Sequence, residues 1–325
     1  MSDSMRLSLA PLEGLTGHVM RRVHHRLYPG TDRYYTPFLS PIDPPGLTPR
    51  ALSEVARENN VGIPLVPQLL TNRVDHFLAA AHTLAELGYE EVNLNLGCPS
   101  GTVVAKGKAS GMLCDPDSVD RLLDGIFSSC PIAVSVKTRV GRFSAEEIVP
   151  LMEVYNRYPL AELIVHPRIR NQMYRGSVDL DAFDHVMRTA RMPVCYNGDL
   201  FSPSDVARIR SAYPSLSSLM LGRGVIANPG LICEVKGAPR TSRATLRAYH
   251  DELLADTADL LSGDRHVIRR MKEYWFYLIC LFENAEHYGK QLRKSNTMAE
   301  YLAAAHAIFD SCPIGRDAAF LPPSV

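Results

Sequence analysis

Hydrophobic residues occupy every second position in a series of short segments, and between these segments they recur at steps of three and four residues. The first spacing is typical of β-strands and the second of helices that bury one face. Strands are expected at residues 6–11, 33–38, 63–69, 92–96, 132–137, 162–166, 193–197 and 219–222. Eight alternating strand and helix units in about 235 residues predict the α/β class and a (β/α)8 TIM barrel.

Local signals predict where some helices begin and end. Thr16 is expected to cap the first helix, and Pro116 suits the first turn of another. Gly88 is expected to close the helix before the fourth strand. The segment at residues 100–111 is longer than a connection needs to be, so we expect a loop that covers a site.

Beyond residue 237 the strand pattern stops, and helical spacing continues at residues 242–261, 266–281 and 297–309. We therefore predict a barrel domain at residues 1–237 and an all-helical domain at residues 238–325. The tail from Phe320 onward is expected to fray. The helical part is locally basic through Arg265, Arg269, Arg270, Lys272, Lys290, Arg293 and Lys294.

Composition narrows the class of partner and the compartment. The chain has 325 residues with 35 Lys and Arg against 35 Asp and Glu, so a nucleic acid would have to meet a local basic surface. The seven cysteines show neither a C-x-x-C pair nor a repeated spacing, which predicts reduced thiols in a cytoplasm and no metal. Neither a signal peptide nor an apolar run of membrane-spanning length is found, so we expect no membrane segment.

Polar residues follow the predicted strands at or just beyond their carboxyl ends. These ends converge on one face of a TIM barrel, and we expect the side chains to line a single pocket. The residues are Gln68, Asn95, Cys98, Lys137, His166, Asn197 and Arg223.

Two glycine-containing turns after the last two strands are suited to a phosphate group. The segments 197–199 (Asn-Gly-Asp) and 222–224 (Gly-Arg-Gly) offer exposed backbone N–H groups, and a helix begins after the second. Residues 222–227 also match the G-x-G-x-x-A dinucleotide pattern. That match is weak because it follows the last strand, and Ala244 stands where a ribose-binding acid is needed.

Three side chains have both a functional and a purely structural interpretation. Lys137 is a Schiff-base lysine, a cation beside a ring oxygen of a ligand, or an ion-pair partner. Cys98 is a reactive thiol or a small buried apolar residue, and its position on a Gly-Cys-Pro turn favours the first. His166 is a ligand contact or a satisfied core histidine.

Seven motifs, and their order along the chain, resemble those of the tRNA-dihydrouridine synthases. The most specific is Leu-Asn-Leu-Gly-Cys-Pro-Ser at residues 94–100, and the helical region after the barrel also agrees with that family. The other motifs are Ala-Pro-Leu-Glu-Gly-Leu-Thr at 10–16, Pro-Gln-Leu at 67–69, Val-Lys-Thr-Arg at 136–139, His-Pro-Arg at 166–168, Asn-Gly-Asp at 197–199 and Gly-Arg-Gly at 222–224.

This resemblance implies an FMN enzyme that uses NADPH to reduce a uridine in tRNA to 5,6-dihydrouridine. It implies that Cys98 donates a proton to C5 after hydride reaches C6, and that Asn95, Arg139 and Tyr174 contact the substrate. Flavin contacts are implied for Pro11, Leu12, Glu13, Gln68, Lys137, His166 and Arg168, and phosphate contacts for Asn197, Gly198, Asp199, Gly222 and Arg223. We expect tRNA as the partner, and a monomer.

The chain departs from the family pattern at Lys108, in a run that is usually small, and at Pro167, where the family has glycine. Three alternatives remain open at this point. The first is an FMN barrel oxidoreductase that acts on a small molecule, similar to dihydroorotate dehydrogenase. The second is a flavin-free barrel with Lys137 as a Schiff base, and the third is a tRNA-binding flavoprotein without turnover.

Overall fold

The computed structural model describes residues 5–316 and 318–320, and their strands form one parallel sheet in the order β3-β2-β1-β9-β8-β7-β6-β5-β4. β3 and β4 stand at the two ends of this order, yet Pro67 alone separates them in sequence. They are two halves of one strand, and the sheet therefore closes into an eight-stranded barrel. The segments are β1 (Arg6–Leu9), β2 (Arg33–Tyr35), β3 (Leu65–Val66), β4 (Gln68–Leu69), β5 (Glu91–Leu96), β6 (Ala133–Gly141), β7 (Leu163–Ile169), β8 (Val194–Tyr196) and β9 (Ser218–Leu221).

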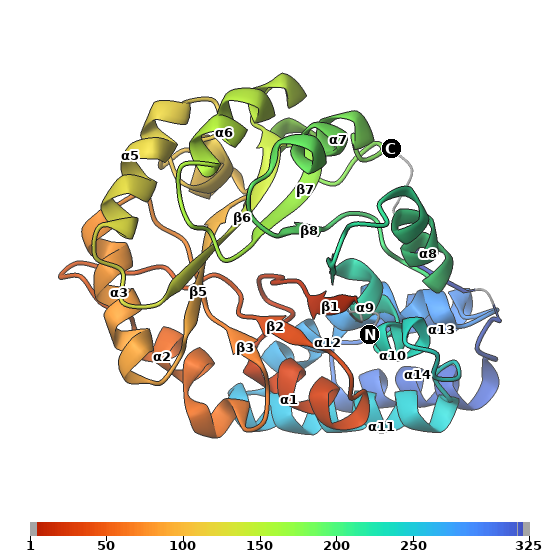
Figure 1. Ribbon diagram of the computed structural model, residues 1–325. Helices are drawn as coiled ribbons and strands as arrows, with labels where there is room; N and C mark the ends of the chain where they lie inside the picture. Colours follow the sequence, from red (N-terminus) through yellow and green to blue (C-terminus); the bar gives the residue numbers. More distant parts are fainter. Residues whose placement is uncertain (1–4, 317, 321–325) are drawn as a thin grey trace.

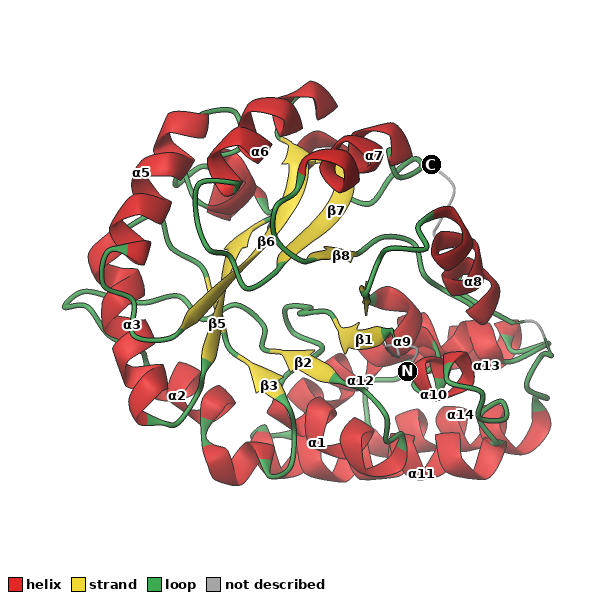
Figure 2. Cartoon of the chain, in the orientation of Figure 1, coloured by secondary structure: helices red, strands yellow, loops and turns green. Residues whose placement is uncertain are grey.

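The helices of the barrel surround the strands in a ring (Figures 1 and 2). Outward strand residues such as Leu94 and Val136 pack against them in one large apolar core. The predicted (β/α)8 barrel is thereby confirmed. The helices are α1 (His18–Leu27), α2 (Pro49–Val55), α3 (Val74–Glu86), α4 (Gly101–Val104), α5 (Pro116–Phe127), α6 (Ile148–Tyr155), α7 (Leu180–Thr189), α8 (Pro203–Ala212), α9 (Arg223–Ala227) and α10 (Leu231–Val235).

The interior of the barrel has an apolar side and a polar side. Ala10, just after β1, and residues of β2, β3, β7, β8 and β9 form a small separate apolar cluster, which includes Tyr35, Ile164 and Met220. On β5 and β6 the inward positions are polar, and Asn93 and Ser135 are fully buried. The strict alternation of β5 arises because its two faces meet different surroundings.

After the barrel the chain is helical, in α11 (Arg243–Leu260), α12 (Asp264–Leu278), α13 (Glu286–Lys294) and α14 (Met298–Ser311). α11 lies alongside α1 (Figure 1), and the rings of Tyr28 and Tyr249 meet edge to face at 5.7 Å. The division into domains at residues 237 and 238 stays a prediction. α13 was not predicted because it buries only Gly289 and Leu292, too few positions to show a helical period.

Several predicted boundaries are wrong. Thr16 does not cap α1, which begins after Gly17; its hydroxyl instead accepts a hydrogen bond from the backbone of Leu12 at 2.8 Å. The fifth predicted strand is β6, which continues to residue 141. Lys137 therefore lies inside the barrel and not at its rim. The connection at residues 100–111 is partly helical, with α4 and a 3-10 turn.

The expected fraying of the tail is wrong for Phe320, which is buried and packs on the ring of Phe201 at 5.4 Å. Residues 321–325 lie outside the described residues. Within the described part of the chain, no helix is long and apolar enough to cross a membrane. The same residues contain no group of three or more His, Cys, Asp or Glu side chains that could hold a metal ion.

Candidate active site

A cavity of about 60 Å³ lies in the carboxyl half of the barrel, between the ends of β1 and β6 to β9. Its wall joins residues more than 200 positions apart in sequence, as the barrel rule predicts. Ten of the predicted site residues line it, namely Pro11, Leu12, Lys137, His166, Tyr174, Asn197, Gly198, Asp199, Gly222 and Arg223.

Lys137 brings an ammonium group to the wall of this cavity. In the described part of the chain its ammonium makes no hydrogen bond, and its pKa is lowered to about 7, first by burial and then by the charge of Arg139. A lysine in this state gains most from an anionic or strongly dipolar ligand, because such a partner would offset its desolvation.

Arg168 joins the loops after β7 and β8 by hydrogen bonds. Its two terminal nitrogens both donate to Asp199, and the remaining N–H groups bond His166 Nε2 at 3.1 Å and the carbonyls of Arg175 and Gly176 at 3.2 and 2.6 Å. All five of its donors are therefore used within the protein.

His166 is held neutral by this arrangement. Burial, followed by the charges of Arg139 and Lys137, sets its pKa well below the ordinary value. Because arginine only donates, His166 Nε2 must accept the bond from Arg168, and the ring proton sits on Nδ1. The ring can thus offer a ligand one N–H donor.

Arg223 lines the cavity and lies against three aromatic rings. Its guanidinium donates to Asp199 at 2.9 Å and lies 4.8 Å from the centre of the Tyr174 ring and 5.2 Å from that of Phe201. The centre of the Phe320 ring lies 5.8 Å from the same guanidinium. The tail of the chain thus reaches the predicted phosphate segment.

The turn that carries Cys98 is fixed from three directions. Asn95 Oδ1 accepts hydrogen bonds from the backbone N–H groups of Gly97 and Cys98, at 3.0 and 2.9 Å. Arg139 Nε donates to the carbonyl of Gly97 at 3.0 Å, and the Ser110 hydroxyl donates to that of Cys98 at 2.7 Å. The thiol is half-buried, and burial raises its pKa, so it stays protonated at neutral pH.

The segment with the atypical Lys108 folds back over this turn. The buried Ser110 anchors it to Cys98, and Asn72 Nδ2 donates to the carbonyls of Lys106 and Gly107 at 3.3 and 3.1 Å. Ala109, next to Ser110, has a φ of 49°, and Met173 and Asp199 in neighbouring loops have φ of 54° and 44°. Such strained backbone is typical of functional sites.

The loop between β1 and α1 separates the cavity from a second, wider one. Pro11 and Leu12 line the first cavity, whereas Glu13, Gly14 and Leu15 line a groove of about 1060 Å³ against α12. We call this second cavity the α12 groove. Its other walls include Arg265, Arg269, Arg270, Lys272, Glu273, Phe276 and Tyr277.

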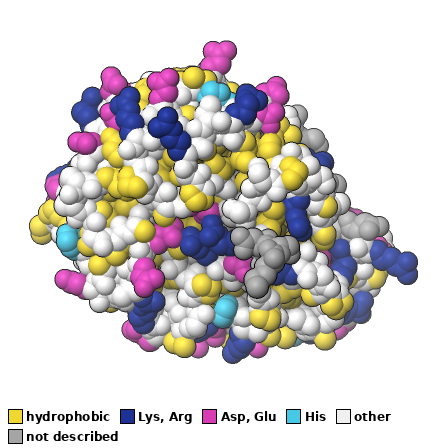
Figure 3. Space-filling model, viewed as in Figure 1, with side chains coloured by type: hydrophobic (Ala, Val, Ile, Leu, Met, Phe, Trp, Pro, Cys, Tyr) yellow, Lys and Arg dark blue, Asp and Glu magenta, His cyan; other side chains and the backbone are white. Residues whose placement is uncertain are grey.

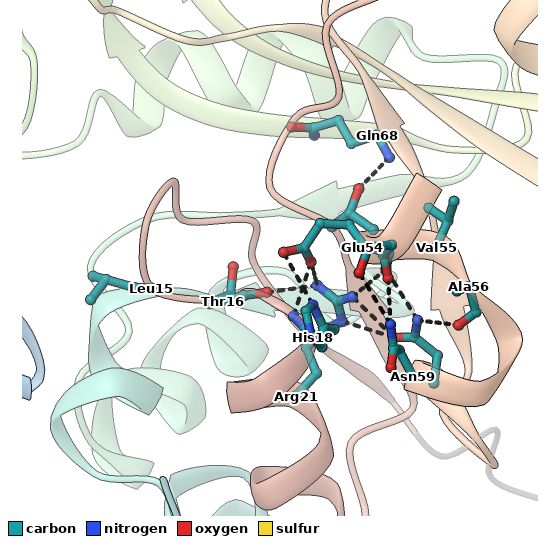
Figure 4. A network of polar contacts seen from close by, with 12 residues as sticks. Leu15, Thr16, His18, Arg21, Glu54, Val55, Ala56, Asn59 and Gln68 are labelled. Atoms are coloured by element: carbon teal, nitrogen blue, oxygen red, sulfur yellow. Dashed lines mark hydrogen bonds and ion pairs between the residues drawn. The ribbon is translucent and has the colours of Figure 1, made fainter. Parts of the chain in front are cut away.

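An ion pair between Arg21 and Glu54 holds the loop between β1 and α1 (Figure 4). The guanidinium of Arg21 donates to the carbonyl of Thr16 at 2.7 Å and contacts the carboxylate of Glu54 at 3.3 Å. From the other side, the hydroxyl of Tyr274 on α12 donates to the carbonyl of Leu15 at 2.6 Å. The loop is therefore bonded both to the barrel and to the helical part.

Six predicted site residues do not line the first cavity. Arg168 lies behind it and Glu13 in the α12 groove. Cys98 lies on its own turn, which Asn95 and Arg139 hold. Gln68 is fully buried and bonds Asn95.

Sequence reasoning missed three residues that shape the site, namely Asn93, Ser110 and Phe320. Asn93 had a visible signal, because it alternates in phase with Asn95. Ser110 and Phe320 had none, because no local spacing indicates their contacts with the carbonyl of Cys98 and the ring of Phe201.

Comparison with known proteins decides the family. A family model described as dihydrouridine synthase (Dus) matches residues 8–312. The chain belongs to this family. The match spans the barrel and the C-terminal helices together, in agreement with the resemblance drawn from the motifs.

Similar proteins are named tRNA-dihydrouridine synthases, and two of them match nearly the whole chain. A tRNA-dihydrouridine(16) synthase of Ralstonia nicotianae is 27% identical over 316 residues, which are 93% of this chain and 96% of that protein. The protein of the same name from Escherichia coli O157:H7 is 28% identical over 313 residues, 94% and 98% of the two chains. The tRNA-dihydrouridine synthase B of Pasteurella multocida is 27% identical over 229 residues, 70% and 67% of the two chains.

Solved structures support the fold. Morphinone reductase superposes with a TM-score of 0.53 at 12% identity and covers 74% of this chain and 88% of its own. This likeness concerns the barrel architecture.

Proposed function

We propose that this protein uses FMN and NADPH to reduce a uridine in tRNA to 5,6-dihydrouridine, with Cys98 as the proton donor. The observation that carries this proposal is the Cys98 turn, in which a thiol kept protonated by burial stands on a turn tied to Asn95, Arg139 and Ser110. Family membership supports the class of reaction.

The residues of the first cavity fit FMN in chemical type. Lys137, without a hydrogen-bond partner in the described residues, would face the flavin's pyrimidine edge, and Asn197, Gly198, Gly222 and Arg223 would hold the phosphate. When bound, FMN would supply hydride to C6 of the uracil and NADPH would restore it.

The size of the cavity adds a requirement. At about 60 Å³ it holds a few water molecules, so its wall must rearrange to admit a flavin. Tyr174 is 41% exposed, so its displacement removes little buried surface.

Cys98 completes the reaction by proton transfer. The C5=C6 bond of uracil is conjugated to the C4 carbonyl, so hydride at C6 leaves negative charge on C5 and O4. The Sγ–H bond then breaks, its proton forms the new C5–H bond, and the thiolate regains a proton from solvent. Asn95 Oδ1 is committed to the turn, so that side chain can offer a uracil its remaining N–H and hence can bond a carbonyl oxygen.

The α12 groove is suited to the tRNA backbone. Basic and acidic side chains are interspersed over the face seen in Figure 3, in keeping with a net charge of zero. In the groove, Arg270 is paired with Glu273 at 2.9 Å, and Lys272 donates to the carbonyls of Arg293 and Ser295. Arg269 is 83% exposed in its side chain and 4.0 Å from Glu273, which leaves it available for a phosphate.

The central experiment measures dihydrouridine in unmodified tRNA after incubation with the purified protein and NADPH. Cys98→Ala should keep its flavin spectrum and lose most product, because the proton donor is missing. Cys130→Ala is the matched control, since Cys130 lies between α5 and β6 at the opposite end of the barrel. Full activity of Cys98→Ala would contradict the assignment, and a wild-type protein that reduces only small enones would support the alternative reductase.

Mapping product across the tRNA would identify the modified uridine. The relatives that match along their full length are named for position 16, so that position is the first to examine. Binding is tested with Arg265→Gln combined with Arg269→Gln. We expect weaker tRNA binding and a salt dependence whose slope falls by about 2, while Arg121→Gln on the distant α5 leaves both unchanged.

A further inference from the structure

A row of amide side chains crosses the polar side of the barrel interior and ends at the Cys98 turn. Gln68, Asn93 and Ser135 are direct neighbours in register on β4, β5 and β6, and all three are fully buried. Gln68 Nε2 lies 2.8 Å from Asn93 Oδ1, and Asn93 Nδ2 lies 2.9 Å from Ser135 Oγ. At the other end, Asn95 Nδ2 lies 2.8 Å from Gln68 Oε1.

The direction of every bond in this row is fixed by the backbone. The N–H groups of Gly97 and Cys98 can only donate, so the Asn95 atom that meets them must be oxygen. Asn95 then presents its NH2 to Gln68, and Gln68 presents its own NH2 to Asn93. An amide that flipped would place two donors or two acceptors face to face in a buried site.

Asn93 stabilises these amide orientations from inside the barrel. Its Oδ1 is the acceptor that keeps the Gln68 amide in the orientation that Asn95 requires. It lies two residues before Asn95 on the same face of β5, and it lines neither of the two cavities.

We propose that Asn93 is a positioning residue for Cys98, which acts by fixing the orientation of the Gln68 and Asn95 amides and thereby the Gly97-Cys98 turn. The consequence for the reaction rests on the proposed function, whereas the consequence for the position of the thiol does not. Loss of the acceptor at Asn93 leaves a buried N–H of Gln68 unpaired, so the Gln68 side chain can turn away and Asn95 Nδ2 loses its acceptor. Asn95 is then held only by the backbone N–H groups of Gly97 and Cys98. The turn then samples other positions, and proton transfer to the substrate slows.

The test compares Asn93→Leu with Asn93→Asp in the full-length, flavin-loaded enzyme. Leucine has a similar size and no acceptor, whereas the carboxyl group of aspartate still accepts from Gln68 in either protonation state. Enzyme reduced with NADPH is mixed anaerobically with saturating tRNA, and reoxidation is followed by flavin absorbance. We expect a rate about tenfold lower or more for Asn93→Leu, with tRNA affinity unchanged, and recovery towards the wild-type rate for Asn93→Asp.

A second measurement does not depend on tRNA. Alkylation of Cys98 by iodoacetamide, followed by mass spectrometry, should be several-fold faster in Asn93→Leu and close to wild type in Asn93→Asp. Wild-type alkylation and reoxidation in a folded Asn93→Leu protein would overturn the inference, and so would equal impairment of both variants. If Asn93→Leu does not fold, Asn93→Ala takes its place with the same readouts.

The two proposals fail in different ways. If the wild-type enzyme forms no dihydrouridine, the proposed function fails, while the alkylation rates still decide whether Asn93 positions the thiol. If the wild type is active and the Asn93 variants behave alike, the positioning role fails alone.

Discussion

Lys137→Met tests the electrostatics of the barrel interior. The pKa of Lys137 falls from 10.5 to about 7 because the side chain is buried and Arg139 is close. One pKa unit corresponds to about 1.4 kcal/mol, so a proton on Lys137 costs the folded state about 5 kcal/mol below pH 7. Methionine has a similar shape and no charge, and the variant should therefore be more stable by a large part of this amount.

The gain depends on pH in a defined direction. The folded pKa is below the unfolded one, so the unfolded state binds more protons between pH 7 and 10.5, and stability of the wild type rises with pH there. The advantage of Lys137→Met should shrink from about 5 kcal/mol at pH 6.5 to about 2 kcal/mol at pH 9.

Urea unfolding of flavin-free protein at pH 6.5 and pH 9 measures both values. Lys236→Met is the control, because that lysine forms a surface ion pair with Asp32 at 2.7 Å and should change stability by less than about 1 kcal/mol. A gain that is independent of pH, or a loss of stability at pH 6.5, would refute the assignment of a strongly depressed lysine. Added FMN should reduce the gain if Lys137 faces the electron-rich pyrimidine edge of its ring.

Three further changes address other parts of the molecule. Ser110→Ala should cost about 1 kcal/mol in urea unfolding and slow turnover, because it removes the bond to the carbonyl of Cys98; unchanged turnover would contradict this. Gly224→Ala should lower Tm by an amount equivalent to about 1–3 kcal/mol, because its Cβ would stand 2.2 Å from a backbone oxygen, whereas Gly46→Ala, 3.8 Å from its nearest atom, should not. The pKa of His24 is lowered to about 4 by burial, so stability should fall by about 3 kcal/mol between pH 6.5 and 4, and His24→Gln should flatten that slope.

The barrel could be predicted from the sequence because its strands pack against helices on one face. The outward residues of β5, such as Leu94, give a period of two that no turn interrupts. The prediction ended β6 too early because Lys137 and Arg139 look like the start of a loop. Both point into the barrel, where Arg139 bonds two backbone carbonyls, so the strand continues through them.

The cavity was predictable because parallel strands place their carboxyl ends together whatever their separation in sequence. The order of bonds within the site was not. That Asn93 faces Gln68 on one side and Ser135 on the other is a matter of register, and register is set by how eight strands close around a common interior. The alternation at residues 92–96 showed that Asn93 and Asn95 share a face of the strand, yet it did not predict a hydrogen-bond partner for either side chain. A polar side chain inside a barrel needs a hydrogen-bond partner. The backbone N–H of Cys98 requires the oxygen of Asn95, and Asn93 supports that orientation through Gln68.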